Sequence, residues 1–376
     1  MTKESVVVAK GLEGVVAEAT QLSDVQGDVG RLLYRGYDIN ALAEFSTFEE
    51  TVYLLWYGNL PNQKQLDEFR AQLAAQRALP ASVIAQMKTF PRDATPMDVL
   101  RSVVSLLGVN AADKGNAADL APVQGQRLTA QMAMIATAWN SIRNGHEPVA
   151  PRADLNHAAN FLYMLTGQEP DPRAARIIDT ALVLHADHSL NASTFVARSI
   201  ASTLSDMYSA IVGALGALKG PLHGGANEAV MRTLLKIGSV EGVEPFVADT
   251  LAHKGKVMGF GHRVYRANDP RALYLQKIAR EAAHVSGNDL WYNMQEAMRH
   301  AVQSRKPLPV NVDFYSASVY YSLAIPIDLF TPVFAVSRIA GWTAHVLEQY
   351  ADNRIVRPDA LYIGPRALQY IPLQER

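Results

Sequence analysis

The side chain best suited to removing a proton from carbon is that of Asp313, which lies in residues 311–315, of sequence NVDFY. Its apolar and aromatic neighbours would keep water from the carboxylate, and a desolvated carboxylate is a stronger base. An aspartate that follows a proline and an asparagine also fits the cap of a helix. Asp313 is therefore a candidate general base, with a helix cap as the alternative.

A histidine flanked by glycines, His223, lies in residues 219–228, of sequence KGPLHGGANE. Glycine lets the backbone approach a ligand closely, and the pattern puts the imidazole at the N-terminus of a helix, where the helix dipole disfavours its protonated form. A neutral imidazole in such a place can donate a hydrogen bond to a carbonyl oxygen. The alternative is a turn that contains an incidental histidine.

A basic, glycine-spaced loop covers residues 256–271 and contains the sequence GFGH at residues 259–262. Between His253 and Arg271 the chain has five lysines and arginines and two histidines, but only one acid, Asp269. Backbone groups of such a loop can contact a planar base or a phosphate, and arginines bind carboxylate or phosphate oxygens in pairs. The loop is a candidate anion site, and a solvated basic loop is the alternative.

Two histidines, His185 and His188, close a predicted helix and would share one of its faces. They are candidates for a hydrogen-bonded pair, for part of a metal site or for an anion-binding group. A metal site would need a further cluster of carboxylates or histidines, and the sequence offers none of similar quality. We therefore predict no metal.

Two arginines near the end of the chain are also candidates for binding a carboxylate. Arg338 lies in an apolar helical segment, and Arg357 stands before a proline. An arginine on an apolar face is costly unless it contacts an anion. A structural salt bridge is the alternative for each.

The composition excludes several kinds of chemistry. The chain has no cysteine, which rules out disulfides, thiolate zinc sites and acyl-cysteine intermediates. Its net charge of −1 gives no general attraction for nucleic acid. No apolar stretch reaches the roughly 18 residues of a membrane helix, and no secretory signal opens the chain, so we expect a cytoplasmic protein that binds neither membrane nor nucleic acid. The glycosylation pattern NAS at Asn191 is attributed to chance.

Helical spacing of apolar residues dominates the chain, and the βαβ rhythm of a parallel sheet is missing. We therefore expect an all-α fold of roughly a dozen helices, with short β-hairpin strands near the N-terminus, around residues 6–8, 14–19 and 32–37. A cluster of glycines around Gly220 is a candidate hinge, with a return near residues 313–326, so that a small lobe is inserted into a larger one. The predicted helices span residues 47–57, 95–107, 127–143, 173–184, 194–218, 271–285, 290–304 and 329–349.

The order of these candidates resembles the citrate synthase family over nearly the whole sequence, in its short, dimeric form. The most specific pieces are three. They are PLHG at residues 221–224, GFGH at residues 259–262 with DPR at residues 269–271, and NVD at residues 311–313. The coincidence of all three in register identifies the chain as similar to that family.

The resemblance implies an almost wholly helical, citrate synthase-like subunit in which two domains close over the substrates. The large domain would contain residues 1–221 and 324–376, and the small domain residues 222–323. By the same resemblance, the protein is an acyltransferase that condenses acetyl-CoA with oxaloacetate and hydrolyses citryl-CoA to citrate and CoA, the first step of the tricarboxylic acid cycle. No cofactor is implied besides acetyl-CoA as co-substrate.

The resemblance also assigns roles to the candidate residues. Asp313 would remove a methyl proton from acetyl-CoA, His223 would donate a hydrogen bond to the thioester oxygen, and His262 would polarise the keto oxygen of oxaloacetate. The carboxylates of oxaloacetate would contact His188, Arg271, Arg338 and Arg357, the last from the partner subunit of a homodimer. CoA would contact Lys256, Val257, Met258, Gly259, Phe260, Gly261, Arg263 and Arg266.

The nearest alternative is a 2-methylcitrate synthase, which uses propionyl-CoA. One methylene is worth only about 1–3 kcal/mol in a pocket, so the sequence leaves both acyl groups open. A metal hydrolase built on His185 and His188, and a helical scaffold without activity, are the alternatives from other classes.

Overall fold

Helices make up most of the chain, as the spacing of apolar residues predicts. The structure is a computed structural model that describes residues 8–113, 115–262 and 264–376, and these contain sixteen α-helices. The predicted all-α fold class is confirmed. The helices outnumber the prediction partly because residues 194–218 form two helices rather than one. The helices are α1 Ile39–Phe45, α2 Phe48–Tyr57, α3 Gln63–Gln76, α4 Ala81–Met87, α5 Pro96–Asn110, α6 Ala117–Arg143, α7 His157–Thr166, α8 Pro172–His185, α9 Ala192–Ala201, α10 Met207–Leu218, α11 Ala226–Ile237, α12 Val243–Ala252, α13 Pro270–Ser286, α14 Leu290–Gln303, α15 Val312–Ser322 and α16 Phe330–Ala351, with short 3₁₀ helices at Lys10–Leu12, Ile327–Leu329 and Leu373–Glu375.

The strands form one small antiparallel sheet in the order β1-β2-β3. β1 (Ser23–Gln26) pairs with β2 (Arg31–Tyr34), which pairs with β3 (Tyr37–Asp38). Short hairpin strands near the N-terminus are thus present, as expected. The expectation for residues 14–19 is wrong, because this largely exposed segment has an alternating pattern but no pairing partner among the described residues. Residues 6 and 7 of the first expected strand lie outside the described residues.

Local capping signals set helix boundaries where the sequence predicts them. The Thr47 side chain accepts a hydrogen bond from the Glu50 N–H, and the Glu50 carboxylate accepts one from the Thr47 N–H, so the predicted capping box opens α2. Gly58 ends the same helix with a left-handed φ of 84°. Thr95 caps α5 directly before Pro96. These helix ends are therefore fixed by short-range hydrogen bonds.

Helix α16 passes through the core and is buried along almost its whole length. It packs against α2, α6, α8 and α9. A helix that is apolar all round is one that lies inside the protein, and the rings of Phe330 and Trp342 are fully buried. Among its buried polar residues is Arg338, which is only 1% exposed.

A glycine in α16 allows this helix to touch the turn that follows α8. The Gly341 N–H donates a hydrogen bond to the Ala186 carbonyl oxygen at 3.0 Å. A Cβ atom on Gly341 would lie 2.4 Å from Asp187 Oδ1 and 2.5 Å from the Ala186 oxygen. The close approach brings Arg338, one turn earlier on α16, against the end of α8, where its Nε donates to the His185 carbonyl oxygen at 2.7 Å.

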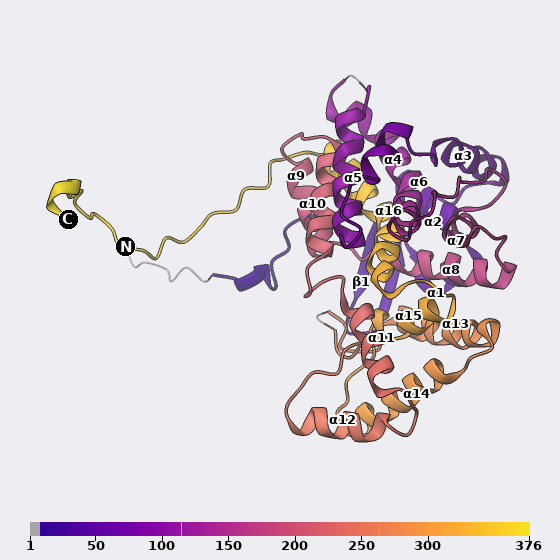
Figure 1. The fold of residues 1–376 in the computed structure, drawn as a ribbon. Helices are drawn as coiled ribbons and strands as arrows, with labels where there is room; N and C mark the ends of the chain where they lie inside the picture. Colours follow the sequence, from indigo (N-terminus) through magenta and orange to yellow (C-terminus); the bar gives the residue numbers. More distant parts are fainter. Residues whose placement is uncertain (1–7, 114, 263) are drawn as a thin grey trace.

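Figure 1 shows two groups of helices of unequal size. Helices α11 to α15 lie together at one end of the subunit, and most of the remaining helices form a larger body. Helix α1 of the larger body lies against α13. The described N-terminal residues before β1 and the C-terminal segment after α16 extend away from the larger body on the same side (Figure 1). None of the described helices is long and apolar enough to cross a membrane.

We expect Gly341→Ala to destabilise the subunit, because the added methyl group would collide with a backbone oxygen and a carboxylate that are themselves buried. Overpacking of this kind costs about 1–3 kcal/mol. Urea unfolding at one protein concentration measures the effect as a lower midpoint. An unchanged midpoint would show that α16 and the turn after α8 can move apart without loss of stability.

Candidate active site

The glycine motif and the segment before Asp313 are far apart in the sequence but pair in space. An isolated antiparallel bridge joins Phe260 and Val310. It is flanked by hydrogen bonds from the N–H groups of Gly261 and Asn311, which reach the carbonyl oxygens of residues 309 and 259 at 2.8 and 3.0 Å. The pairing brings two of the predicted motifs side by side.

Asp313 is the second residue of α15, and the helix is capped by Asn311 rather than by Asp313 itself. The Asn311 side chain accepts a hydrogen bond from the Asp313 N–H at 3.1 Å and donates one to the Gly261 carbonyl oxygen at 3.0 Å. The helix-cap alternative for Asp313 is therefore wrong.

The surroundings of the Asp313 carboxylate favour its action as a general base. Its Oδ1 atom is buried and has no hydrogen-bond partner among the described residues. Burial raises the pKa of Asp313 to about 7, although the nearby charges of Arg271 and Arg338 oppose the increase. A carboxylate with this pKa is a base matched to neutral solution.

His223 lies in the turn between α10 and α11, and its imidazole is uncharged at neutral pH. Burial and the charge of Arg338 lower its pKa to about 4. Its Nε2 atom lies 2.8 Å from the Ser193 hydroxyl oxygen, which also accepts a hydrogen bond from Trp342 Nε1 at 3.1 Å. The side chain is thus held in the neutral state that the sequence predicts.

The tautomer of His262 is fixed by the backbone. Its Nδ1 atom accepts hydrogen bonds from the N–H groups of Val264 and Tyr265, each at 3.0 Å. A backbone N–H can only donate, so Nδ1 carries no proton and the proton of the neutral ring is on Nε2. Burial and the charge of Arg271 lower the pKa of His262 to about 4. The ring therefore offers one N–H donor on its free side.

Arg271 is buried at the N-terminus of α13 beside its partner Asp269. The Asp269 carboxylate accepts hydrogen bonds from the Arg271 backbone N–H at 3.0 Å and from Nε and Nη2 of its guanidinium at 3.0 and 2.7 Å. Both side chains are at most 3% exposed. The pair leaves the Nη1 group, with two N–H donors, outside the ion pair.

Arg338 is a buried cation that contacts a carbonyl and an aromatic ring. Besides its hydrogen bond to His185, its guanidinium lies 4.6 Å from the centroid of the Phe334 ring. No carboxylate among the described residues lies within 4.0 Å of the guanidinium, so the salt-bridge alternative is not supported. Burial lowers the pKa of Arg338 to about 10. An anionic ligand would compensate this buried charge.

His188 follows the end of α8 at His185, so the expectation that the two histidines share a helical face is wrong. The His185 Nδ1 atom lies 2.7 Å from the Ala181 carbonyl oxygen inside the helix. His188 instead places Nε2 3.3 Å from the Tyr265 hydroxyl, and its ring centroid is 5.5 Å from that of His262. The described residues contain no group of three or more potential metal ligands.

The two buried guanidiniums connect most of the predicted residues electrostatically. Arg271 and Arg338 both lower the pKa values of His188 and Asp313. Arg338 also lowers the pKa of His223, and Arg271 also lowers the pKa of His262. Six of the seven residues predicted for catalysis or oxaloacetate binding therefore share one charged neighbourhood. They are His188, His223, His262, Arg271, Asp313 and Arg338.

Arg357 is the predicted residue that does not join this neighbourhood within the chain. Its side chain is 77% exposed, and its Nη1 atom lies 3.2 Å from the Asp359 carboxylate. It belongs to the C-terminal segment after α16, which extends away from the larger body (Figure 1). Arg357 is therefore not among the buried residues of this site in the single chain.

The residues predicted to contact CoA are divided between interior and surface. Val257 and Gly259 are buried, whereas Lys256 and Arg266 are exposed, and Arg266 Nε lies 3.7 Å from Asp28. Arg263 lies outside the described residues. The loop therefore has an apolar inner side and a basic outer side.

A cavity of about 700 Å³ lies beside the turn that carries His223. Pro221, Gly225 and Met258 contribute to its wall, so it borders both the histidine turn and the glycine loop. Four basic side chains also line it. They are Arg92, Arg143, Lys219 and Arg232. Three acids, Asp93, Glu228 and Asp328, line it as well, so the charges around the cavity are mixed.

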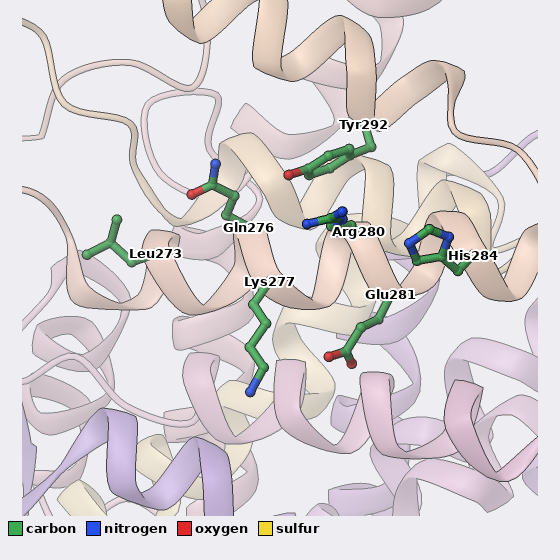
Figure 2. Close-up of a pocket in the computed structure, with 7 residues that line it drawn as sticks. All are labelled: Leu273, Gln276, Lys277, Arg280, Glu281, His284 and Tyr292. Atoms are coloured by element: carbon green, nitrogen blue, oxygen red, sulfur yellow. The ribbon is translucent and has the colours of Figure 1, made fainter.

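A second pocket, of about 500 Å³, lies on the surface between α13 and α14. Figure 2 shows its seven lining residues, none of which was predicted for the site. One of them, Lys277, forms an ion pair with Glu44 at 3.0 Å. This pocket is separate from the catalytic candidates. Its lining residues are Leu273, Gln276, Lys277, Arg280, Glu281, His284 and Tyr292.

Comparison with known proteins agrees with this geometry. The family model described as "Citrate synthase, C-terminal domain" matches residues 11–359. The chain belongs to the citrate synthase family. The predicted family and fold are thereby confirmed.

Relatives in the citrate synthase family match along their full lengths. Citrate synthase 2 of Bacillus subtilis is 50% identical over 98% of this chain and 99% of its own. The 2-methylcitrate synthase 2 of Corynebacterium glutamicum is 42% identical over 98% of each chain. A solved structure, the ternary complex of citrate synthase from Thermoplasma acidophilum with carboxymethyl coenzyme A and oxaloacetate, is 31% identical, with a TM-score of 0.91 over 98% of this chain and 100% of that one.

Sequence reasoning missed the residues that orient the catalytic candidates. Ser193 contacts His223, although its segment was attributed to a chance glycosylation pattern. Asn191 in that pattern is the N-cap of α9, since its side chain accepts from the Thr194 N–H. A helix-cap interpretation of the same residues was the signal that could have placed Ser193 on the first turn of a helix, but nothing local indicates its contact with His223.

The raised pKa of Asp313 predicts how its replacement changes stability with pH. The ordinary carboxyl pKa of 3.8 is raised to about 7 in the folded chain, so ionisation between these values weakens the fold. We expect Asp313→Asn to gain stability relative to the wild type as pH rises from about 4 to about 7, by up to about 4 kcal/mol at about 1.4 kcal/mol for each pKa unit. Urea unfolding of both proteins across this range measures the difference. A difference that does not change with pH would contradict a desolvated Asp313.

Proposed function

We propose that this protein condenses acetyl-CoA with oxaloacetate and hydrolyses the resulting citryl-CoA to citrate and CoA. The observation that carries the proposal is the combination of a basic carboxylate and two neutral imidazoles around two buried guanidiniums. Such a set can remove a proton from a carbon beside a thioester while it binds a dicarboxylate. The homologous ternary complex with carboxymethyl coenzyme A and oxaloacetate supports the same substrates.

In the first step, Asp313 takes a proton from the methyl group of acetyl-CoA while His223 donates a hydrogen bond to the thioester oxygen. This requires a proton on His223 Nδ1, so Nε2 must accept one. The Ser193 hydroxyl accepts from Trp342 Nε1, so its single proton can go either to His223 Nε2 or to Asn191 Oδ1, each 2.8 Å away. The proposed role of His223 requires that Ser193 donates to His223.

In the second step, the carbon of the enolate attacks the keto carbon of oxaloacetate. His262 Nε2 donates to the keto oxygen and transfers its proton as the alkoxide forms. The two backbone donors on Nδ1 make Nε2 the nitrogen that carries the proton before this transfer and stabilise the negative charge of the ring after it. Water then hydrolyses the citryl thioester, which makes the overall reaction favourable. The ring regains a proton from water when the citryl thioester is hydrolysed.

The carboxylates of oxaloacetate would be bound by His188, Arg271 and Arg338 in one subunit and by Arg357 from its partner. Arg338 is supported by its burial without a carboxylate within 4.0 Å in the described chain. Arg271 is supported by the Nη1 group left outside its ion pair with Asp269. Burial strengthens both interactions because little water competes for the anion.

We further propose that residues 222–323 form the small domain and residues 1–221 with 324–376 the large domain. The grouping of α11 to α15 in Figure 1 supports this division. Closure of the two would exclude water until the carbon–carbon bond has formed.

For CoA, we propose that residues 257–261 line the adenine and that Arg266 contacts a phosphate, with Lys256 and Arg263 as further candidates for the same basic patch. The buried Val257 and Gly259 support an apolar surface for a planar base. The cavity beside His223, which Met258 lines, supports a path for the acyl arm toward the catalytic groups.

A spectrophotometric assay of thiol release from acetyl-CoA, with and without oxaloacetate, tests the proposed function. We expect release that depends on oxaloacetate, and we expect Asp313→Asn to lower kcat by about 10²–10⁴-fold, since the amide cannot accept the proton. Calorimetry with oxaloacetate serves as the control, because the variant keeps the residues proposed to bind it. Near-normal turnover by Asp313→Asn would exclude this residue as the base.

The same assay distinguishes the second candidate function, condensation of propionyl-CoA. The 42% identity to a 2-methylcitrate synthase supports propionyl-CoA as an alternative substrate. The higher identity of 50% to a citrate synthase favours acetyl-CoA. We expect a higher kcat/KM for acetyl-CoA. A clear preference for propionyl-CoA would overturn this assignment.

A homodimer that shares Arg357 between subunits predicts complementation. Exposed apolar side chains along the same segment, including Ile363 at 91% and Tyr370 at 81%, support a partner surface. We expect Arg357→Ala and Asp313→Ala to be inactive alone, because each lacks one residue in both sites. Co-refolded mixtures would recover about a quarter of the wild-type sites, since half of the dimers are mixed and each mixed dimer has one intact site. No recovery would place Arg357 outside the partner's site.

A further inference from the structure

The turn of the β1–β2 hairpin, residues 27–30, packs on the loop that follows His262. The Gly27 carbonyl oxygen accepts hydrogen bonds from the N–H groups of Arg266 and Ala267, at 3.1 and 3.4 Å. The loop is otherwise short of regular structure, because it lies between an isolated bridge at Phe260 and the start of α13. The Gly27 carbonyl oxygen is therefore a hydrogen-bond acceptor for a segment that lies outside the described helices and strands.

The contact leaves no room for a side chain at Gly27 or Gly30. A Cβ atom on Gly27 would lie 2.4 Å from the Val264 carbonyl oxygen. One on Gly30 would lie 2.5 Å from the Asn268 carbonyl oxygen. Both obstacles are backbone atoms, which cannot rotate away as a side chain can. The glycines are thus required by the close approach of the two backbones.

The other end of the same hairpin holds the turn that carries His188. Ser23 and Tyr34 face each other in the register of β1 and β2. The Ser23 hydroxyl donates to the Asp187 carboxylate and accepts from the Ser189 N–H at 2.9 Å. The Tyr34 hydroxyl donates to the Asp187 carbonyl oxygen at 2.8 Å and accepts from the Asp187 N–H at 3.0 Å. One side of His188 is therefore fixed by the base of the hairpin.

We propose that the β1–β2 hairpin is a positioning element of the oxaloacetate site, whose base fixes His188 and whose tip fixes the loop that orients His262. The two N–H groups that set the His262 tautomer belong to Val264 and Tyr265, directly before the residues bonded to Gly27. A displaced loop would remove these donors and free the ring. The oxaloacetate part of this inference rests on the proposed function.

The ion pair at the same place does not explain the contact. Arg266 Nε and Asp28 Oδ1 are 3.7 Å apart, and both side chains are more than 80% exposed. Exposed pairs contribute little, typically below about 1 kcal/mol. The backbone contacts of Gly27 and Gly30 therefore account for the docking of the tip.

The test compares Gly27→Ala with Gly36→Ala. A methyl group on Gly27 meets the Val264 oxygen, whereas Gly36, in the turn between β2 and β3, has a φ of 87° and nothing within 4 Å of its Cβ position. The control thus strains the same sheet without touching the loop. Calorimetry should show that Gly27→Ala binds oxaloacetate about tenfold or more weakly than the wild type, as expected for a misplaced site, while Gly36→Ala stays close to the wild type.

A spectroscopic measurement separates positioning from general loss of structure. Long-range ¹H–¹⁵N spectra of the imidazoles should show a single His262 tautomer with the proton on Nε2 in the wild type and in Gly36→Ala. Gly27→Ala should add the second tautomer or exchange between the two. A Gly27→Ala variant that binds oxaloacetate normally and keeps one tautomer would overturn the proposal.

If Gly27→Ala does not fold, the proposal can still be tested by amide hydrogen exchange of the wild-type protein. The Arg266 and Ala267 amides should be protected, and oxaloacetate should increase their protection. Exchange at the rate of unstructured amides, with and without oxaloacetate, would overturn the proposal. A wild type that shows protected amides and one tautomer but does not bind oxaloacetate would contradict the proposed function and support the hairpin contact.

Discussion

Two positive charges enclosed in the protein interior are the constraint on which the rest of the site depends. Arg271 is neutralised by Asp269 on one edge, and Arg338 is held by a backbone carbonyl and the face of Phe334. Neither guanidinium can lose its charge easily, so the surroundings must adapt to them. The nearby histidines remain neutral because burial and these cations both disfavour a further positive charge.

Burial raises the pKa of the carboxyl group and lowers the pKa of the imidazoles, and this difference separates the base from the hydrogen-bond donors. The same loss of water that raises the pKa of Asp313 to about 7 lowers those of His223 and His262 to about 4. The carboxylate thus becomes a better base, while the rings remain uncharged donors. Environments that move pKa values apart in this way distinguish the base from the hydrogen-bond donors.

Much of this arrangement could be predicted from the sequence because its chemical groups lie in short motifs. Asp313, His223 and His262 were each found from a few neighbouring residues, and helical spacing indicated the fold class. The supporting contacts were not predictable, since they join distant segments: Ser193 meets His223 across 30 residues. Helix ends were also uncertain, because whether α8 continues past His185 depends on how α16 packs against it.

The enclosed charge of Arg338 has a consequence for how long the protein survives. A folded state that holds a buried cation without a carboxylate in direct contact gains free energy when an anion binds to it, whereas the unfolded chain gains nothing. A ligand that binds at this place therefore also favours refolding. Resistance to heat and to proteases would therefore rise with the supply of a dicarboxylate. The amount of intact protein in a cell would in this way reflect the abundance of the small molecule that it consumes.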